Sequence, residues 1–153
     1  MNSKSKSSLF ISILIPLAIG ILSALLSGDM SDSAFNKPPL NPPSYIFPIV
    51  WTILYILMGI SSYIIYFSNN QNKDKAIKSY AIQLFFNFFW SIIFFRFSQY
   101  LIAFIWLIIL IAFIIRMIYQ FYKIKPLAAY LQIPYLLWCL FAAYLNFMIY
   151  LLN

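Results

Sequence analysis

The sequence predicts an all-α membrane protein: a bundle of five transmembrane helices, with the N-terminus in the cytoplasm and the C-terminus outside. Of its 153 residues, 64% are hydrophobic and only 8% are charged, whereas soluble domains are about 45–50% apolar and about 25% charged. Five apolar stretches are each long enough to cross a hydrocarbon core, which takes about 20 residues. Lysine and arginine gather in the loops of one side, a bias that is typical of cytoplasmic loops.

The five apolar stretches cover residues 9–27, 45–67, 79–97, 100–122 and 127–152. Only short polar segments separate them, so we expect a single membrane domain over residues 1–153. Lys4 and Lys6 precede the first stretch, as they would in a secretory signal peptide. The apolar run is longer than the usual h-region of about 7–15 residues, and Pro16 interrupts it. We therefore expect this stretch to remain as the first helix.

Small residues repeat every four positions at the end of the first stretch, at Gly20, Ala24 and Gly28. Small side chains let two membrane helices approach closely, either within one chain or between two copies. We therefore expect a homodimer, and this face is one candidate for its interface.

The second stretch follows a loop with four prolines, at residues 37–43. Proline has no backbone N–H and favours extended or first-turn helical conformations. The loop is therefore expected to be stiff and to end where a helix begins. Trp51 and Tyr55 follow at positions i and i+4, so they share one face of that helix. These features predict a stiff loop over an aromatic site near a membrane surface.

Amide and aromatic side chains follow helical spacing in the third and fifth stretches. Gln83, Asn87 and Trp90 share a face of the third stretch. An amide that faces lipid is costly, so we expect these side chains to point into the bundle. The fifth stretch has a comparable face, made of Tyr135, Trp138, Ala142 and Asn146. In the fourth stretch, Arg116 is interpreted as a side chain that extends to the membrane surface.

The orientation follows from the positions of the basic residues. If the loops alternate between the two sides, Lys37 and Arg96 lie on one side. The N-terminus and the other loops contribute seven residues to the opposite side: Lys4, Lys6, Lys73, Lys75, Lys78, Lys123 and Lys125. The more basic side is expected to be cytoplasmic, which places the proline loop and the C-terminus outside.

The residues that the sequence lacks exclude several kinds of chemistry. There is no His, and Cys139 is the only Cys, so neither an intrachain disulfide nor a Cys/His metal site can form. The only acids are in loops, whereas membrane proton relays place acids inside helices. The net charge of +7 is spread over short loops rather than gathered in a nucleic-acid-binding patch. We expect no metal, no cofactor and no nucleic-acid partner.

Each aromatic or amide residue also has a simpler interpretation. Trp and Tyr form belts at membrane interfaces, and buried polar groups link helices at about 0.6–2 kcal/mol each. Trp106 is the side chain that fits the belt best. Aromatic or amide faces on three separate helices nevertheless favour a ligand pocket between them.

Taken together, these residues resemble the TspO/MBR family of tryptophan-rich sensory proteins, whose mitochondrial members are called translocator protein or peripheral benzodiazepine receptor. The matching segments are 37–43, 47–55, 83–95 and 134–146. The resemblance implies a five-helix fold in the cell membrane. It implies binding of porphyrins such as protoporphyrin IX and of benzodiazepine-site drugs. In some members it implies light- and oxygen-dependent breakdown of protoporphyrin.

Mapped onto this sequence, the resemblance implies a set of ligand contacts: Trp51, Tyr55, Asn87, Trp90, Trp138 and Ala142. Trp51 and Asn87 are the implied hydrogen-bond donors to a ligand carbonyl. Trp51 and Trp138 are the residues that we assign to any oxidative chemistry, because indoles are electron-rich. Residues 145–153 contain no basic residue, unlike the cholesterol motif of mitochondrial members, so we expect weak or no specific sterol binding there.

Two other functions are kept as alternatives, a porphyrin carrier and a ligand-dependent stress sensor. Many secondary transporters contain inverted repeats, and five spans do not divide into two equal halves. A sensor needs a surface for its partner, but the predicted cytoplasmic segments are short. We therefore place ligand binding first, degradation second, transport third and signalling last.

Overall fold

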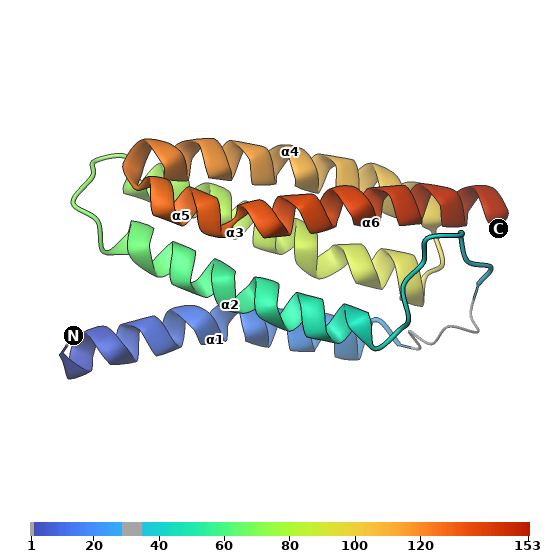
Figure 1. The fold of residues 1–153 in the computed structure, drawn as a ribbon, viewed down its shortest axis with the longest axis horizontal. Helices are drawn as coiled ribbons and strands as arrows, with labels where there is room; N and C mark the ends of the chain where they lie inside the picture. Colours follow the sequence, from blue (N-terminus) through green and yellow to red (C-terminus); the bar gives the residue numbers. More distant parts are fainter. Residues whose placement is uncertain (1, 29–34) are drawn as a thin grey trace.

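The computed structural model describes residues 2–28 and 35–153, and it is a bundle of long helices that run nearly parallel to one another (Figure 1). In the described part of the chain, five helices are long and apolar enough to cross a membrane. This confirms the five-helix membrane bundle. The two termini lie at opposite ends of the bundle, as an odd number of spans requires.

The helices follow the chain in a simple order. They are α1 (Ser3–Leu26), α2 (Ile46–Tyr66), α3 (Lys73–Ser91), a π-helical turn η2 (Ile92–Arg96), α4 (Tyr100–Ile124), α5 (Pro126–Leu131) and α6 (Ile133–Leu152). Figure 1 shows α1 beside α2, with α4, α5 and α6 on the other side of the bundle and α3 between the two groups.

Two helices begin earlier than the apolar pattern predicts. The first starts at Ser3 and the third at Lys73, six residues before the stretches at 9 and 79. The Asn2 side chain accepts a hydrogen bond from the Ser5 N–H at 2.8 Å, and Asp74 lies in the first turn of α3. A capping side chain and an acid at a helix N-terminus both stabilise helical turns. These polar turns therefore extend each helix beyond its apolar span.

The fifth stretch is divided into two helices, which its hydropathy does not reveal. The short α5 ends at Leu131 and α6 begins at Ile133, with Gln132 between them. Pro134 lies in the first turn of α6 and has no N–H to donate, so it cannot continue the hydrogen bonds of a preceding helix. The break separates α5, which contacts both α4 and α2, from α6, which contacts α4.

The main core lies where α2, α3, α4, α5 and α6 meet, and its fully buried side chains include Met58, Met117, Phe121 and Tyr135. The helix α1 is different, because only Pro16 and Ser23 are buried along its length. It packs along α2, where Gly59 allows contact between the two backbones. A Cβ at Gly59 would lie 2.7 Å from the Ser12 carbonyl oxygen.

Candidate functional site

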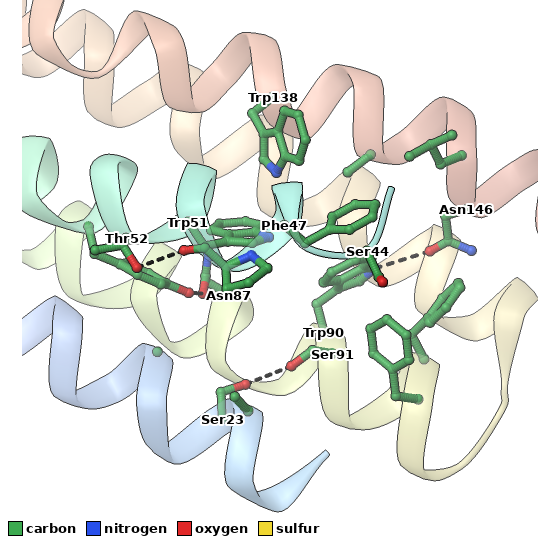
Figure 2. Close-up of a pocket in the computed structure, with 18 of the residues that line it drawn as sticks. Ser23, Ser44, Phe47, Trp51, Thr52, Asn87, Trp90, Ser91, Trp138 and Asn146 are labelled. Carbon is green, nitrogen blue, oxygen red and sulfur yellow. Dashed lines mark hydrogen bonds between the residues drawn. The ribbon is translucent and has the colours of Figure 1, made fainter. Parts of the chain in front are cut away.

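A cleft of about 600 Å³ lies in the half of the bundle nearer the C-terminus, between α1, α2, α3 and α6 (Figure 2). Its walls are mostly aromatic and aliphatic, and none of the described lining residues is acidic or basic. Ligand pockets commonly have volumes of about 300–1,000 Å³, apolar walls and a few polar groups. The cleft therefore suits an apolar ligand of drug-like size or larger.

The cleft brings together all six residues that the sequence analysis selected: Trp51, Tyr55, Asn87, Trp90, Trp138 and Ala142. The ring of Trp51 stacks on that of Tyr55, with centroids 5.5 Å apart and an interplanar angle of 28°. Its edge also meets Tyr135 at 6.2 Å. The i, i+4 spacing of the two α2 residues thus produces the shared face that was predicted, and two tyrosines support the Trp51 indole.

Asn87 lies at the centre of a buried hydrogen-bond network. Its Oδ1 accepts from the Tyr55 hydroxyl at 2.8 Å, and its Nδ2 donates to the Tyr135 hydroxyl at 2.9 Å. The Tyr135 hydroxyl in turn donates to Gln83 Oε1 at 2.6 Å. The network joins α2, α3 and α6 at the base of the cleft. Both polar atoms of the Asn87 amide therefore have protein partners, although its sequence position suggested a ligand contact.

Trp90 forms a second link between helices. Its Nε1 donates to Asn146 Oδ1 at 3.0 Å, and Asn146 Nδ2 donates to the Tyr100 carbonyl at 2.8 Å. These bonds join α3, α6 and the start of α4. The Trp90 indole N–H is occupied, so this residue offers a ligand the surface of its ring.

In the part of the chain that the structure describes, the indole N–H groups of the two remaining cleft tryptophans have no hydrogen-bond acceptor. Trp138 Nε1 is buried and has no hydrogen-bond partner among the described residues. Within the same residues, the Trp51 indole N–H has none either. Phe47 lies beside Trp138, with ring centroids 5.8 Å apart, and Figure 2 shows the Trp138 indole directed from α6 into the cleft. Ala142, one turn further along α6, leaves space beside this ring.

The α1 side of the cleft is lined by small residues. A Cβ at Gly20 would lie 2.8 Å from Cζ of the Tyr55 ring, so the glycine makes room for that ring. Ser23 donates to the Phe88 carbonyl at 2.6 Å and lies 2.7 Å from the Ser91 hydroxyl. Gly20 and Ala24 line the cleft itself. Gly20, the first residue of the small-residue repeat, therefore serves packing within the chain. The homodimer for which this repeat was a candidate interface stays a prediction.

The mouth of the cleft is covered by the loop between α1 and α2. Phe35, Asn41 and Ser44 from this loop line the cleft. The Phe35 ring is held edge-on against Phe94, with centroids 5.5 Å apart. Asn36 is linked to the last residue, because its backbone N–H donates to Asn153 Oδ1 at 3.1 Å and its carbonyl accepts from Asn153 Nδ2 at 3.0 Å.

Sequence reasoning missed the loop residues and further contributors from η2 and α6. Phe94 and Ile149 line the cleft one turn beyond Trp90 and near Asn146, and continued helical spacing could have found them. No periodic signal identifies Phe35, Asn41 or Ser44, because a loop has no fixed face. The expectation of no metal site stays a prediction. The described residues contain no cluster of three or more side chains that could hold a metal ion.

Comparison with known proteins gives a consistent result. Residues 12–152 match the model of the TspO/MBR family. The chain is 38% identical to the tryptophan-rich protein TspO of Archaeoglobus fulgidus over 145 residues, which cover 93% of this chain and 94% of the relative. It is 32% identical to the tryptophan-rich sensory protein of Cereibacter sphaeroides, over 81% of this chain and 77% of the relative. It is 31% identical to the human translocator protein, over 77% of this chain and 72% of the relative.

Proposed function

Because the chain belongs to the TspO/MBR family of multi-pass membrane proteins, we propose that it binds a tetrapyrrole such as protoporphyrin IX, or a benzodiazepine-site drug, in the cleft. The observation that carries this proposal is the pairing of Trp51 and Trp138. They present two aromatic surfaces to one uncharged cleft, and among the described residues neither indole N–H has a hydrogen-bond partner, the N–H of Trp138 being buried beside the cleft.

The polar groups of the cleft favour a ligand that accepts hydrogen bonds. The indole N–H is a donor only, and Asn87, Trp90 and Asn146 are already paired within the protein. A carbonyl or ring nitrogen on an otherwise apolar ligand would satisfy Trp51 or Trp138. Charged propionates find no cation among the described lining residues, and burying an unpaired charge is costly. The carboxyl groups of a porphyrin should therefore lie at the mouth, toward water.

We further propose that the bound porphyrin is slowly oxidised in light. A photoexcited porphyrin would take one electron from the Trp51 or Trp138 indole, and molecular oxygen would be the terminal oxidant. The close ring contacts of Trp51 with Tyr55 and of Trp138 with Phe47 hold both indoles in place. In this proposal the protein acts in the cell membrane as a homodimer. A carrier or a sensor would use the same cleft for binding but would not consume the porphyrin.

The test is a protoporphyrin IX fluorescence titration of purified protein, followed over time in light and in the dark. Trp51→Phe and Trp138→Phe each keep an aromatic ring and remove the N–H donor. We expect each to weaken binding by about two- to tenfold, the usual net value of one hydrogen bond, and to slow the light-dependent loss of porphyrin.

Trp106→Phe is the matched control. The Trp106 indole donates to the Phe86 carbonyl at 2.8 Å and packs on Phe86 between α3 and α4, outside the cleft. This variant should bind and consume porphyrin as the wild type does. Saturable binding without protein-dependent loss would remove the oxidative part of the proposal. Binding that does not saturate would remove the tetrapyrrole itself.

A further inference from the structure

Four polar atoms that lie buried beyond the base of the cleft have no hydrogen-bond partner among the described residues by distance and angle, although the Tyr80 hydroxyl lies near the Ser62 side chain. They belong to three side chains that do not line the cleft: the Tyr80 hydroxyl, Gln83 Nε2, and both Nε2 and Oε1 of Gln132. Gln83 and Gln132 are 0% exposed and Tyr80 is 7% exposed. Within a membrane no bulk water reaches such groups, so leaving them unpaired is costly.

These side chains converge on one place in the bundle. Tyr80 and Gln83 are three residues apart and share a face of α3, and Gln132 and Tyr135 have the same spacing at the start of α6. The bond from the Tyr135 hydroxyl to Gln83 Oε1 joins the two faces. Both helices run in the same direction along the bundle (Figure 1). Tyr80 and Gln132 therefore both lie about one turn from that bond, toward the N-terminal end of the bundle.

The break between α5 and α6 adds a further polar group nearby. Gln132 is the residue between the two helices, and Pro134 follows it. Since Pro134 has no N–H, the Tyr130 carbonyl cannot receive the i+4 hydrogen bond of a continuous helix, and it shares the Gln132 N–H with the Ala129 carbonyl instead. Backbone irregularity inside a membrane protein is tolerated where other groups or ordered water satisfy the freed carbonyl.

We propose that this region is a buried water-binding site, separate from the ligand cleft. The unpaired atoms are complementary to water: Gln83 Nε2 and Gln132 Nε2 are donors, Gln132 Oε1 is an acceptor, and the Tyr80 hydroxyl is both. Buried water usually makes two to four hydrogen bonds to such groups. The bound water continues the chain of hydrogen bonds that runs from Tyr55 through Asn87 and Tyr135 to Gln83. The cleft thereby gains a hydrated connection toward the N-terminal end of the bundle.

The first test is a crystal structure of the unliganded protein in a lipid phase, at a resolution that shows ordered water. The expected result is water within hydrogen-bonding distance of the Gln83 and Gln132 amides. A direct bond between these two amides, with no water between or beside them, would overturn the proposal. Neither result depends on whether the cleft binds a porphyrin, so this test and that of the proposed function fail separately.

The second test is the stability of Gln132→Met, which keeps the size of the side chain and removes its polar atoms. If Gln132 holds water, the water loses part of its cage, and the melting temperature should fall by about 3 °C or more. If the Gln132 amide is simply unpaired, its removal relieves a buried polar group. A melting temperature equal to or above that of the wild type would therefore contradict the proposal.

Leu136→Met is the matched control for the second test. It introduces the same residue one turn further along α6, at a half-buried apolar position that packs on the core. Exchanges between Leu and Met conserve volume and usually have small effects. The melting temperature of this variant should stay close to that of the wild type. A fall as large as that of Gln132→Met would mean that methionine itself disturbs α6, and would remove the support that Gln132→Met gives.

Discussion

Asn87 uses both polar atoms of its side chain inside the protein, between the hydroxyls of Tyr55 and Tyr135. The sequence could place Asn87 on the inward face of its helix, because an amide that faces lipid is costly. It could not distinguish a ligand donor from a link between helices, because that depends on which side chains of α2 and α6 come within 3 Å. The structure favours the second role for the unliganded protein.

The first prediction follows from that role. Asn87→Ala should reduce the free energy of unfolding by about 2–6 kcal/mol, since it leaves two buried hydroxyls short of a partner at about 1–3 kcal/mol each. It should also loosen Trp51, which stacks on Tyr55. Unfolding in a denaturing detergent measures the first effect, and Trp51 emission in a variant without the other tryptophans measures the second.

Thr52→Ala provides the control for Asn87→Ala. Thr52 also lines the cleft, but its hydroxyl donates at 2.7 Å to the Pro48 carbonyl of its own helix, and the side chain is exposed. Its loss should change stability by less than about 1 kcal/mol. If Asn87→Ala is as stable as Thr52→Ala and only ligand affinity falls, Asn87 is a ligand donor after all.

At the scale of the elements, hydropathy located the helices well and their irregularities poorly. The second stretch, predicted at 45–67, is the helix Ile46–Tyr66. The break at Gln132 and the π-helical turn at Ile92–Arg96 were not predicted. A transfer scale sums apolar side chains over a window, and it is insensitive to the loss of one or two backbone hydrogen bonds. The Pro134 signal was present, but a proline near a helix start does not by itself show a break.

The contact between α1 and α2 gives the second prediction. A Cβ at Gly59 would lie 2.7 Å from the Ser12 carbonyl oxygen and against Ile13 Cα. Backbone cannot move aside as a flexible side chain can, so Gly59→Ala should cost about 1–3 kcal/mol through overpacking. This is opposite in sign to the gain of up to about 1 kcal/mol that Gly→Ala gives in an unconstrained helix.

Hydrogen exchange of α1 and the free energy of unfolding measure this effect. Exchange should quicken along Ser3–Leu26, because that helix has few other buried contacts. Ile53→Ala on α2, the helix that carries Gly59, is the control, since Ile53 is 53% exposed and faces away from the core. A Gly59→Ala variant that is more stable than the wild type would show that α1 can shift without cost.

The loop over the cleft gives the third prediction. Asn153 holds Asn36 through a donated and an accepted hydrogen bond, and Asn36 follows Phe35, which lines the cleft. Asn153→Ala removes both bonds. Because they are exposed, each should be worth about 0.5 kcal/mol net, the low end of the usual range, so a ligand should leave about fivefold faster. Stopped-flow displacement of bound protoporphyrin measures this rate.

The equilibrium stability of the bundle should change little in Asn153→Ala, because the two bonds are exposed. Asn70→Ala, in the loop at the opposite end, is a suitable control: its side chain accepts from the Asn72 N–H and lies far from the cleft. Equal dissociation rates in wild type and Asn153→Ala would mean that the Phe35 contacts and the bond from Asn36 Nδ2 to the Leu152 carbonyl are enough to hold the loop.

At the scale of the whole molecule, counting spans was enough to place the termini at opposite ends, but not to locate the cleft. Beside the cleft α2 packs more closely on the short α5 than on α6, and both α5 and α6 contact α4. Helical spacing predicted the inward faces, because each helix presents one such face, and the family resemblance selected the wall residues on them. The loop that covers its mouth could not be placed, since nothing periodic fixes a loop relative to four helices.

The last prediction concerns the orientation of the molecule, which rests on the seven basic residues at one end against two at the other. The N-terminus should face the cytoplasm and the loop over the cleft should face outside. Cys139 is buried and is the only cysteine, so a Cys139→Ala background has no thiol. Ser5→Cys then introduces one thiol at a half-buried position and Ser44→Cys one at an exposed position, at opposite ends of the bundle.

A membrane-impermeant maleimide added to intact cells should label Ser44→Cys and leave Ser5→Cys unlabelled until the membrane is opened. The opposite pattern would mean that the molecule is inserted in the opposite orientation, with the mouth of the cleft on the cytoplasmic side. Labelling of both thiols in intact cells would mean a mixed topology, which a bias of seven to two should prevent. The outcome also decides from which side a porphyrin reaches the cleft, because Phe35, Asn41 and Ser44 line its mouth.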